Sequence, residues 1–195
     1  MPKIGMEAIR REELVDAAIH EIGERGSLNV TVGQIAKRAG VSPALAFHYF
    51  KGKDQMFLAA MRSILTVYGA EVRGALVAAK RPEDRLEALI RASFGPSNFR
   101  HEVVAAWLNF YVLALTDAGA RRLLTVYQRR LRSNLVHELR PRAGDRAPAI
   151  AERLVGLIDG LYLHAALDTG DTDGKAAAEQ VLAALACDLK QRDTE

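Results

Sequence analysis

The stretch TVGQIAKRAGVSPALAFHYFKGK, residues 31–53, decides the expected fold of the N-terminal part of the chain. Thr31 and Gln34 have the spacing of a capping box, in which two side chains satisfy free backbone N–H groups in the first turn of a helix. Apolar residues follow at helical spacing, and Gly40 suits the left-handed turn that ends a helix. This pattern predicts one short helix over residues 32–39.

A second short helix is predicted directly after this turn. Ser42 is a good N-cap, and Pro43 suits the first turn of a helix that extends to about Phe50. A longer helix precedes the pair and ends at Gly26. Its apolar residues are three and four positions apart, at Leu14, Ala17, Ala18 and Ile22. The small core of this region is expected to contain Ile35, Ala36, Val41, Leu45 and Phe50.

These three predicted helices have the order of a helix-turn-helix domain, which places the second of its two short helices in a major groove of DNA. The residues expected to contact DNA lie on the second short helix or near the helix starts, where backbone N–H groups and the positive dipole end favour phosphate. They are Thr31, Ser42, Pro43, Ala44, Leu45, Phe47, His48, Tyr49 and Lys53.

The rest of the chain also shows helical periodicity, without the two-residue alternation that is typical of strands. We therefore predict an all-α protein of about nine helices, with an N-terminal three-helix domain over residues 1–53 and a helical domain over residues 54–195. A long helix from Asp54 to about Lys80 is expected to link the two domains. Residues 140–147, which contain a proline and a glycine, are predicted to form a loop.

Composition indicates an ordinary soluble protein. The chain has 195 residues, of which 49% are hydrophobic and 26% charged, and its net charge of +3 permits nucleic-acid binding without requiring it. The single cysteine, Cys187, cannot form an internal disulfide, and a buried or half-buried thiol is expected. The absence of a secretory signal and of a long apolar run predicts a cytoplasmic protein without membrane insertion.

The residues of the helix-turn-helix resemble a known family. Thr31, Ile35-Ala36 and Ala39-Gly40-Val41-Ser42, then Phe47, Phe50 and Lys53, match the signature of the TetR family of repressors in identity and spacing. The chain departs from the usual pattern at two positions. Phe47 stands where the family usually has Tyr, and Tyr49 stands where it often has His. We therefore expect Tyr49 to make the phosphate contact that a tyrosine hydroxyl makes elsewhere in the family.

Further blocks resemble the choline-responsive repressors of glycine betaine synthesis within this family. They include Ala106-Trp107-Leu108-x-Phe110 and Leu157-Ile158-Asp159-Gly160-Leu161. The resemblance implies a homodimer that binds a palindromic operator and a small-molecule effector, choline or betaine aldehyde. Residues 54–195 would then be the ligand-binding and dimerisation domain, with apolar stripes at 155–167 and 178–189 that suit either a dimer interface or packing within one subunit.

A quaternary ammonium ligand cannot donate ordinary hydrogen bonds, so its recognition depends on aromatic faces and a carboxylate. The candidate ligand-binding residues are Phe94, Trp107, Phe110, Tyr111, Asp159 and Tyr162. Two alternatives stay open at this point. The aromatic residues can equally be core, and Asp159 can meet an arginine or a backbone donor at a dimer interface instead of a ligand.

Other functions have less support in the sequence. A repressor of the same family that senses another cationic or apolar molecule is the main alternative. An architectural DNA-binding dimer without a ligand is a further one. An enzyme is not expected, because nucleophile-elbow, phosphate-loop and dinucleotide motifs are missing. No metal or cofactor is expected, since the histidines lack the spacing of metal ligands.

Overall fold

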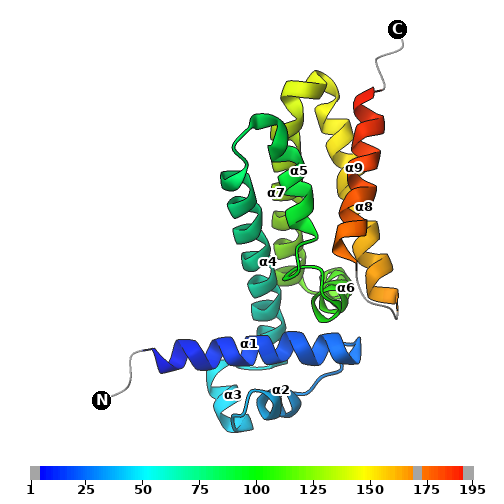
Figure 1. Cartoon of the computed structure of the whole chain (residues 1–195). Helices are drawn as coiled ribbons and strands as arrows, with labels where there is room; N and C mark the ends of the chain where they lie inside the picture. The colour runs from blue at the N-terminus through cyan, green and yellow to red at the C-terminus, as the bar shows by residue number, and fades with distance from the viewer. Residues whose placement is uncertain (1–4, 169–172, 191–195) are drawn as a thin grey trace. The chain divides into compact units, whose positions relative to one another are not determined.

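The computed structural model describes residues 5–168 and 173–190, and within these residues it is all-α, as predicted (Figure 1). Its helices are α1 (Met6–Arg25), α2 (Val32–Arg38), α3 (Pro43–Tyr49), α4 (Lys53–Ala78), α5 (Pro82–Ser93), α6 (His101–Thr116), α7 (Ala118–Ala143), η1 (Gly144–Arg146, a 3₁₀ turn), α8 (Ala147–Leu167) and α9 (Gly174–Lys190). None of these helices alone is long and apolar enough to cross a membrane, although one bent pair passes by length and composition.

The chain forms two compact units. The first unit comprises Met1–Leu65 and His101–Leu123, and the second comprises Thr66–Arg100 and Leu124–Glu195. The division falls inside α4 and α7 and groups α6 with the N-terminal helices, so it differs from a boundary after residue 53. The assignment of residues 1–53 as the DNA-binding domain and 54–195 as the ligand-binding domain stays a prediction.

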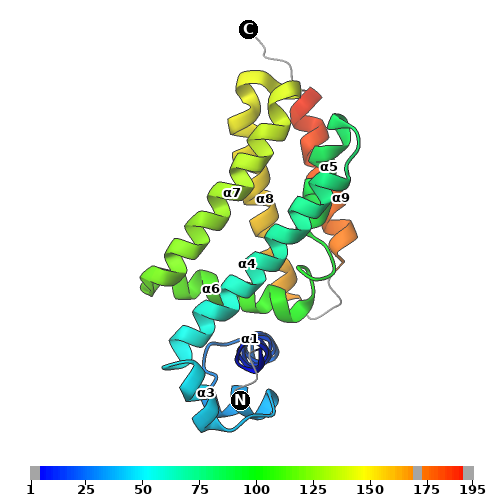
Figure 2. The same cartoon turned by 90° about the vertical axis from the view of Figure 1, so that its left-hand side faces the viewer.

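In the first unit, α1 packs against α2 and α6, and α2 packs against α3. Figures 1 and 2 both show the two short helices beside α1. The predicted inward residues of α1, such as Leu14 and Ile22, are fully buried, as is Ile35 of α2. Two of the five core predictions for this region were wrong in detail, because Val41 and Leu45 are half-buried. Ala46 is the buried residue of α3, whereas Leu45 is half-buried, because Ala46 rather than Leu45 lies on the inward face of this helix.

In the second unit, α9 packs against α5 and α8. The core here is mainly aliphatic, and its fully buried members include Leu86, Leu89, Ile90, Leu131 and Leu135. Ion pairs join helices at the edge of this core. Arg85 of α5 donates to Glu138 of α7 at 2.8 Å, and Arg153 of α8 donates to Asp188 of α9 at 2.8 Å.

Two sequence-based expectations were wrong. The predicted loop at residues 140–147 is mostly helical, since α7 continues through Pro141 to Ala143 and a 3₁₀ turn follows. Burial of Leu139 and Ala143 favours the last helical turn, and Gly144, at φ +52°, then ends it. Cys187 is exposed rather than buried. The buried face of α9 runs through Val181 and Leu185, and a residue two positions further points away from that face.

The contact between α1 and α6 depends on a glycine. A Cβ atom added to Gly23 would lie 2.5 Å from the backbone oxygen of Glu102 and 2.6 Å from its Cα atom. These atoms belong to the first turn of α6, so they cannot move without moving that turn. Gly23 therefore allows the two helix backbones to approach closely.

We expect Gly23→Ala to lower the free energy of unfolding by about 1–3 kcal/mol, because the added methyl group overpacks this contact. Alanine is the better helix former by about 1 kcal/mol, so helix propensity alone predicts the opposite sign. Chemical denaturation followed by circular dichroism measures the change. Gly74→Ala is the matched control, since Gly74 lies in α4 with nothing within 4 Å of the added atom. A Gly23→Ala variant at least as stable as the wild type would contradict the close-contact explanation.

Candidate DNA-binding site and aromatic cluster

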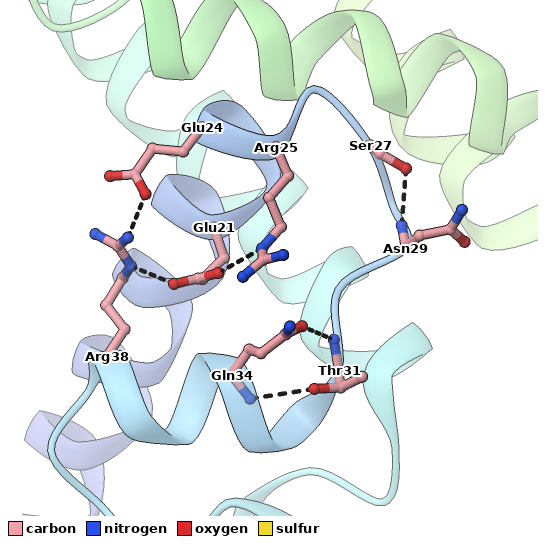
Figure 3. Close-up of polar contacts among 8 residues, drawn as sticks. All are labelled: Glu21, Glu24, Arg25, Ser27, Asn29, Thr31, Gln34 and Arg38. Carbon is pink, nitrogen blue, oxygen red and sulfur yellow. Dashed lines mark hydrogen bonds and ion pairs between the residues drawn. The ribbon is translucent and has the colours of Figure 1, made fainter.

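Both short helices begin with a capped N-terminus. The Gln34 N–H group donates to the Thr31 hydroxyl at 3.2 Å, and the Thr31 N–H group donates to the Gln34 side chain at 2.8 Å. This is the predicted capping box (Figure 3). In α3, the Leu45 N–H group donates to the Ser42 hydroxyl at 3.2 Å, and Pro43 occupies the first turn, as predicted.

The turn between the two helices closes with paired backbone hydrogen bonds. The N–H group of Val41 donates to the Ala36 carbonyl at 3.0 Å, and that of Gly40 donates to the Lys37 carbonyl at 3.2 Å. This pair of bonds is a Schellman motif, which needs a left-handed residue at the position of Gly40. Gly40 has φ +65°, a conformation that side-chain-bearing residues rarely adopt. The glycine therefore sets the direction in which α3 leaves α2.

A buried carboxylate ties α1 to α2. Glu21 is 7% exposed and accepts hydrogen bonds from Arg38 at 2.7 Å and from Arg25 at 2.9 Å (Figure 3). Arg38, in the last turn of α2, also pairs with Glu24. Burial by itself would raise the pKa of Glu21, but the hydrogen bonds and charges of Arg38 and Arg25 outweigh it and lower the pKa. The carboxylate is therefore held in its charged form between two arginines.

The structure exposes most of the predicted DNA-contacting residues. Phe47 of α3 is 52% exposed, and Leu45 and Tyr49 are half-buried. The exposed members of the set are Thr31, Ser42, Pro43, Ala44, Phe47, His48 and Lys53. The rings of His48 and Tyr49 meet edge to face, with centroids 5.3 Å apart. The surface of α3 is thus accessible to a partner, and the role of each residue stays a prediction.

The sequence patterns did not reveal the contacts by which residues of α1 hold α2 and α3 in place. Glu21 and Arg38 are 17 positions apart, and Arg11 and Tyr49 are 38 apart. Glu21 lies on an otherwise apolar face of α1, and a charged residue in such a position indicates a buried ion pair. No local pattern relates Arg11 to Tyr49, because only the folded chain brings them together.

In the second unit, an aromatic cluster joins α5 to α8. Phe94 and Phe99 have ring centroids 5.1 Å apart, and each ring also meets Tyr162, at 5.7 Å and 5.0 Å. All three are buried, and the Tyr162 hydroxyl donates to the backbone oxygen of Ser93. Two of the predicted ligand-binding residues, Phe94 and Tyr162, therefore lie together.

A polar group lies next to this cluster. Ser93 is fully buried, its hydroxyl donates to the Leu89 carbonyl at 3.1 Å, and it lies 3.1 Å from the Tyr68 hydroxyl. Burial and the negative charge of Asp159 raise the pKa of Tyr68 and the Ser93 hydrogen bond lowers it, so that the net pKa is about 12. Asp159 is half-buried, and its Oδ1 atom is shielded from solvent. The Asp159 carboxylate therefore interacts electrostatically with the Tyr68 hydroxyl group.

The other predicted ligand-binding residues belong to the first unit. Trp107 and Tyr111 of α6 meet edge to face, with ring centroids 5.7 Å apart, and Phe110 is fully buried. A groove beside the aromatic cluster also carries basic side chains. This groove, of about 390 Å³ beside Phe94 and Phe99, is lined by Arg91 and Lys175. The Arg91 guanidinium is paired with Glu87 at 2.7 Å and with Glu179 at 2.9 Å, so its charge is largely compensated.

Two capped short helices, a Schellman turn and an exposed second helix, followed by a further helical unit, define a helix-turn-helix transcriptional regulator. The chain belongs to the TetR family of bacterial regulatory proteins, whose family model matches residues 14–60, and its C-terminal part matches the BetI-type transcriptional repressor, C-terminal, over residues 82–189. It is therefore a DNA-binding regulator and not an enzyme. Regulators of this family act as dimers that bind DNA and small-molecule effectors.

The chain is similar over most of its length to proteins described as HTH-type transcriptional regulator BetI. It is 53% identical to the protein of Brucella anthropi, and the match covers 86% of this chain and 87% of the relative. It is 50% identical to the protein of Rhizobium meliloti, and that match covers 86% of this chain and 83% of the relative. Among solved structures, a regulator from Pseudomonas aeruginosa has a TM-score of 0.79 at 25% identity, covering 93% of this chain and 91% of that one. A protein from Saccharomonospora viridis, described as a transcriptional regulator in complex with choline, has a TM-score of 0.77 at 18% identity, covering 92% and 96%.

Glu21→Gln is expected to lower the free energy of unfolding by about 1–3 kcal/mol at neutral pH, because two charged hydrogen bonds are weakened. The folded-state pKa of Glu21 lies below its ordinary value. Its stabilising contribution is therefore complete above the ordinary glutamate pKa and is lost as pH falls through the lower folded value. Denaturation from neutral to acid pH should show the difference between wild type and variant shrinking over that range.

The control for this experiment is Glu12→Gln, which makes the same charge change at an exposed position of α1. This variant should stay within about 0.5 kcal/mol of the wild type. A Glu21→Gln difference that does not depend on pH would mean that the carboxylate charge contributes nothing to the contact between α1 and α2.

Proposed function

We propose that this protein is a cytoplasmic repressor that binds a palindromic operator as a homodimer and senses choline or betaine aldehyde, so that it controls glycine betaine synthesis. The observation that carries the proposal is the match to BetI-type repressors over the C-terminal region, with about half of all residues identical to regulators named BetI.

The DNA-binding part of the proposal is supported by α3. Its exposed side includes His48, which carries hydrogen-bonding atoms suited to base edges, and Phe47, which suits thymine methyl groups. Lys53, at the start of α4, is exposed and can pair with a backbone phosphate. The mild net charge of +3 fits a protein whose DNA affinity depends on this local surface rather than on overall charge.

The effector part is supported by the chemistry of the second unit. Asp159 supplies a negative charge with a shielded oxygen, and Tyr68, Tyr127 and Tyr162 supply aromatic rings in the same unit. A quaternary ammonium gains about 0.5–2 kcal/mol from each aromatic face that it contacts, and a partly shielded carboxylate favours a neighbouring cation. The Saccharomonospora viridis protein indicates that a fold of this kind can hold choline.

The effector can change operator affinity only if it binds the DNA-competent and DNA-incompetent conformations with different affinities. α4 is a continuous helix that begins directly after the helix-turn-helix and carries Tyr68. We therefore assign α4 the coupling role, with the long helix changing the spacing of the two DNA-binding heads of the dimer. A spacing that no longer fits two half-sites would release the operator.

His48→Ala is expected to weaken binding to a duplex from the region upstream of the protein's own gene by about tenfold or more, because a lost base contact is worth about 1–3 kcal/mol. Tyr49→Ala should also weaken binding, and the far-UV circular dichroism of both variants should match the wild type. Fluorescence anisotropy at a stated salt concentration measures the affinity. His137→Ala, at an exposed position of α7, is the matched control and should bind normally. Full affinity in His48→Ala would show that α3 does not read this duplex through His48.

Choline is expected to lower operator affinity and to raise the melting temperature in proportion to RT ln(1 + [L]/Kd). Asp159→Asn should bind choline about tenfold or more weakly, because it removes the carboxylate charge, while DNA binding without choline is retained. Asp145→Asn, at an exposed position of η1, is the control with the same charge change.

Betaine aldehyde, glycine betaine and an unrelated lipophilic cation complete the titration series. A response to the lipophilic cation alone would indicate a different effector of the same family type. Equal operator affinity with and without every compound would rule out the proposed sensing function.

A further inference from the structure

We infer that Arg11 of α1 is a positioning residue for DNA recognition, because it holds the last turn of α3, where His48 and Tyr49 lie. This inference rests on the proposed role of α3 in reading DNA. It assigns a specificity-determining role to a residue outside the helix-turn-helix sequence itself. The contact that carries it is a 2.7 Å hydrogen bond from the Arg11 guanidinium to the backbone oxygen of Tyr49.

The end of α3 needs an external contact. The helix has only seven residues, and helices shorter than about 12 residues are marginally stable by themselves in water. Its N-terminus is fixed by the Ser42 cap. At the other end, the carbonyl of Tyr49 points beyond the last helical turn and has no partner within the helix, as the last four carbonyls of any helix do not. The Arg11 guanidinium provides that partner.

The same guanidinium makes a second contact that fixes its direction. Its central carbon, Cζ, lies 4.6 Å from the centroid of the Phe50 ring. Phe50 is 2% exposed and caps the C-terminus of α3 in an extended conformation. Arg11 thus contacts two successive residues by a hydrogen bond and a cation–π interaction, and this combination suits the planar guanidinium better than an ammonium group.

The location of the Arg11 guanidinium at the C-terminus of α3 and its positive charge both favour this contact. A cation at the C-terminus of a helix interacts favourably with the negative end of the helix dipole. Since His48 and Tyr49 are the last two residues of α3, a change in the final turn would redirect their side chains. Arg11 therefore acts on DNA recognition through these residues and does not need to touch a base or phosphate.

The matched control is the neighbouring arginine. Arg10 lies on the same helix and makes an ion pair with Glu13 within α1, at 2.7 Å. It has the same charge as Arg11 and nearly the same distance along the chain from the helix-turn-helix. A variant at Arg10 therefore reports the loss of one positive charge, together with an ion pair inside α1, without removing the contact at the end of α3.

The experiment compares Arg11→Met, Arg11→Lys and Arg10→Met in the full-length protein. The DNA is a duplex selected by the wild-type protein from a randomised pool, with a scrambled duplex of equal length, measured by anisotropy over a series of salt concentrations. Circular dichroism confirms that each variant is folded at the assay temperature. The ratio of affinities for the selected and scrambled duplexes reports specificity, and the slope of log affinity against log salt reports the number of phosphate contacts.

We expect Arg11→Met to lower the specificity ratio by about tenfold, as for the loss of one base contact, with an unchanged salt slope. Arg11→Lys keeps a donor and a positive charge but loses the planar contact with Phe50, so its ratio should lie between those of Arg11→Met and the wild type. Arg10→Met should leave the ratio unchanged. A salt slope that falls by about 1 in Arg11→Met would overturn the inference, because it would mean a direct phosphate contact instead.

An unchanged specificity ratio in Arg11→Met would also overturn the inference, provided that His48→Ala lowers the ratio in the same assay. If the wild type selects no duplex from the pool, or if His48→Ala binds normally, the proposed role of α3 fails and the inference fails with it. These results distinguish a failure of the positioning role from a failure of the proposed function.

Discussion

The architecture of the DNA-binding unit follows from one constraint: α2 and α3 have seven residues each and cannot hold their geometry alone. Their order comes from caps at the helix starts, a Schellman turn between them and contacts with α1. Glu21 and Arg38 supply the main polar contact with α2. A rigid pair of short helices is what a groove-reading surface needs, because base recognition depends on side chains held in a fixed orientation.

The buried charge at Glu21 illustrates how polar groups specify this geometry. Burying a carboxylate is unfavourable unless it is paired and hydrogen-bonded. Arg38 pairs with it from α2 and Arg25 from α1, so a displacement of α2 would leave the buried charge with only one of these two arginines. In the second unit, Ser93 is likewise a buried polar residue that joins helices. Its hydroxyl lies beside that of Tyr68 of α4, and its backbone carbonyl accepts a hydrogen bond from Tyr162 of α8. One small residue at the end of α5 thus connects three helices.

The candidate sites differ in how far they could be predicted. The helix-turn-helix was predictable because caps and glycine turns are local, so Thr31, Gln34, Gly40 and Ser42 specify their own geometry within a few residues. The aromatic set was less predictable. Helical spacing could not tell that Phe94 and Tyr162 pack together in one unit whereas Phe110 is core in the other. The cations at the groove beside Phe94 were equally hidden, because Arg91 and Lys175 are far apart in the sequence.

The helical class, the bounds of the short helices to within one residue and the family could be read from the chain before folding, because periodicity, capping and motif spacing are properties of neighbouring residues. Which distant residues meet became known only from the folded chain. It placed Glu21 between two arginines, Arg11 on the end of α3, and Asp159 near Tyr68. It also extended α7 through Pro141, where burial of Leu139 and Ala143 outweighs the local preference of proline for a break. Contacts of this kind depend on packing between helices, which no local pattern encodes.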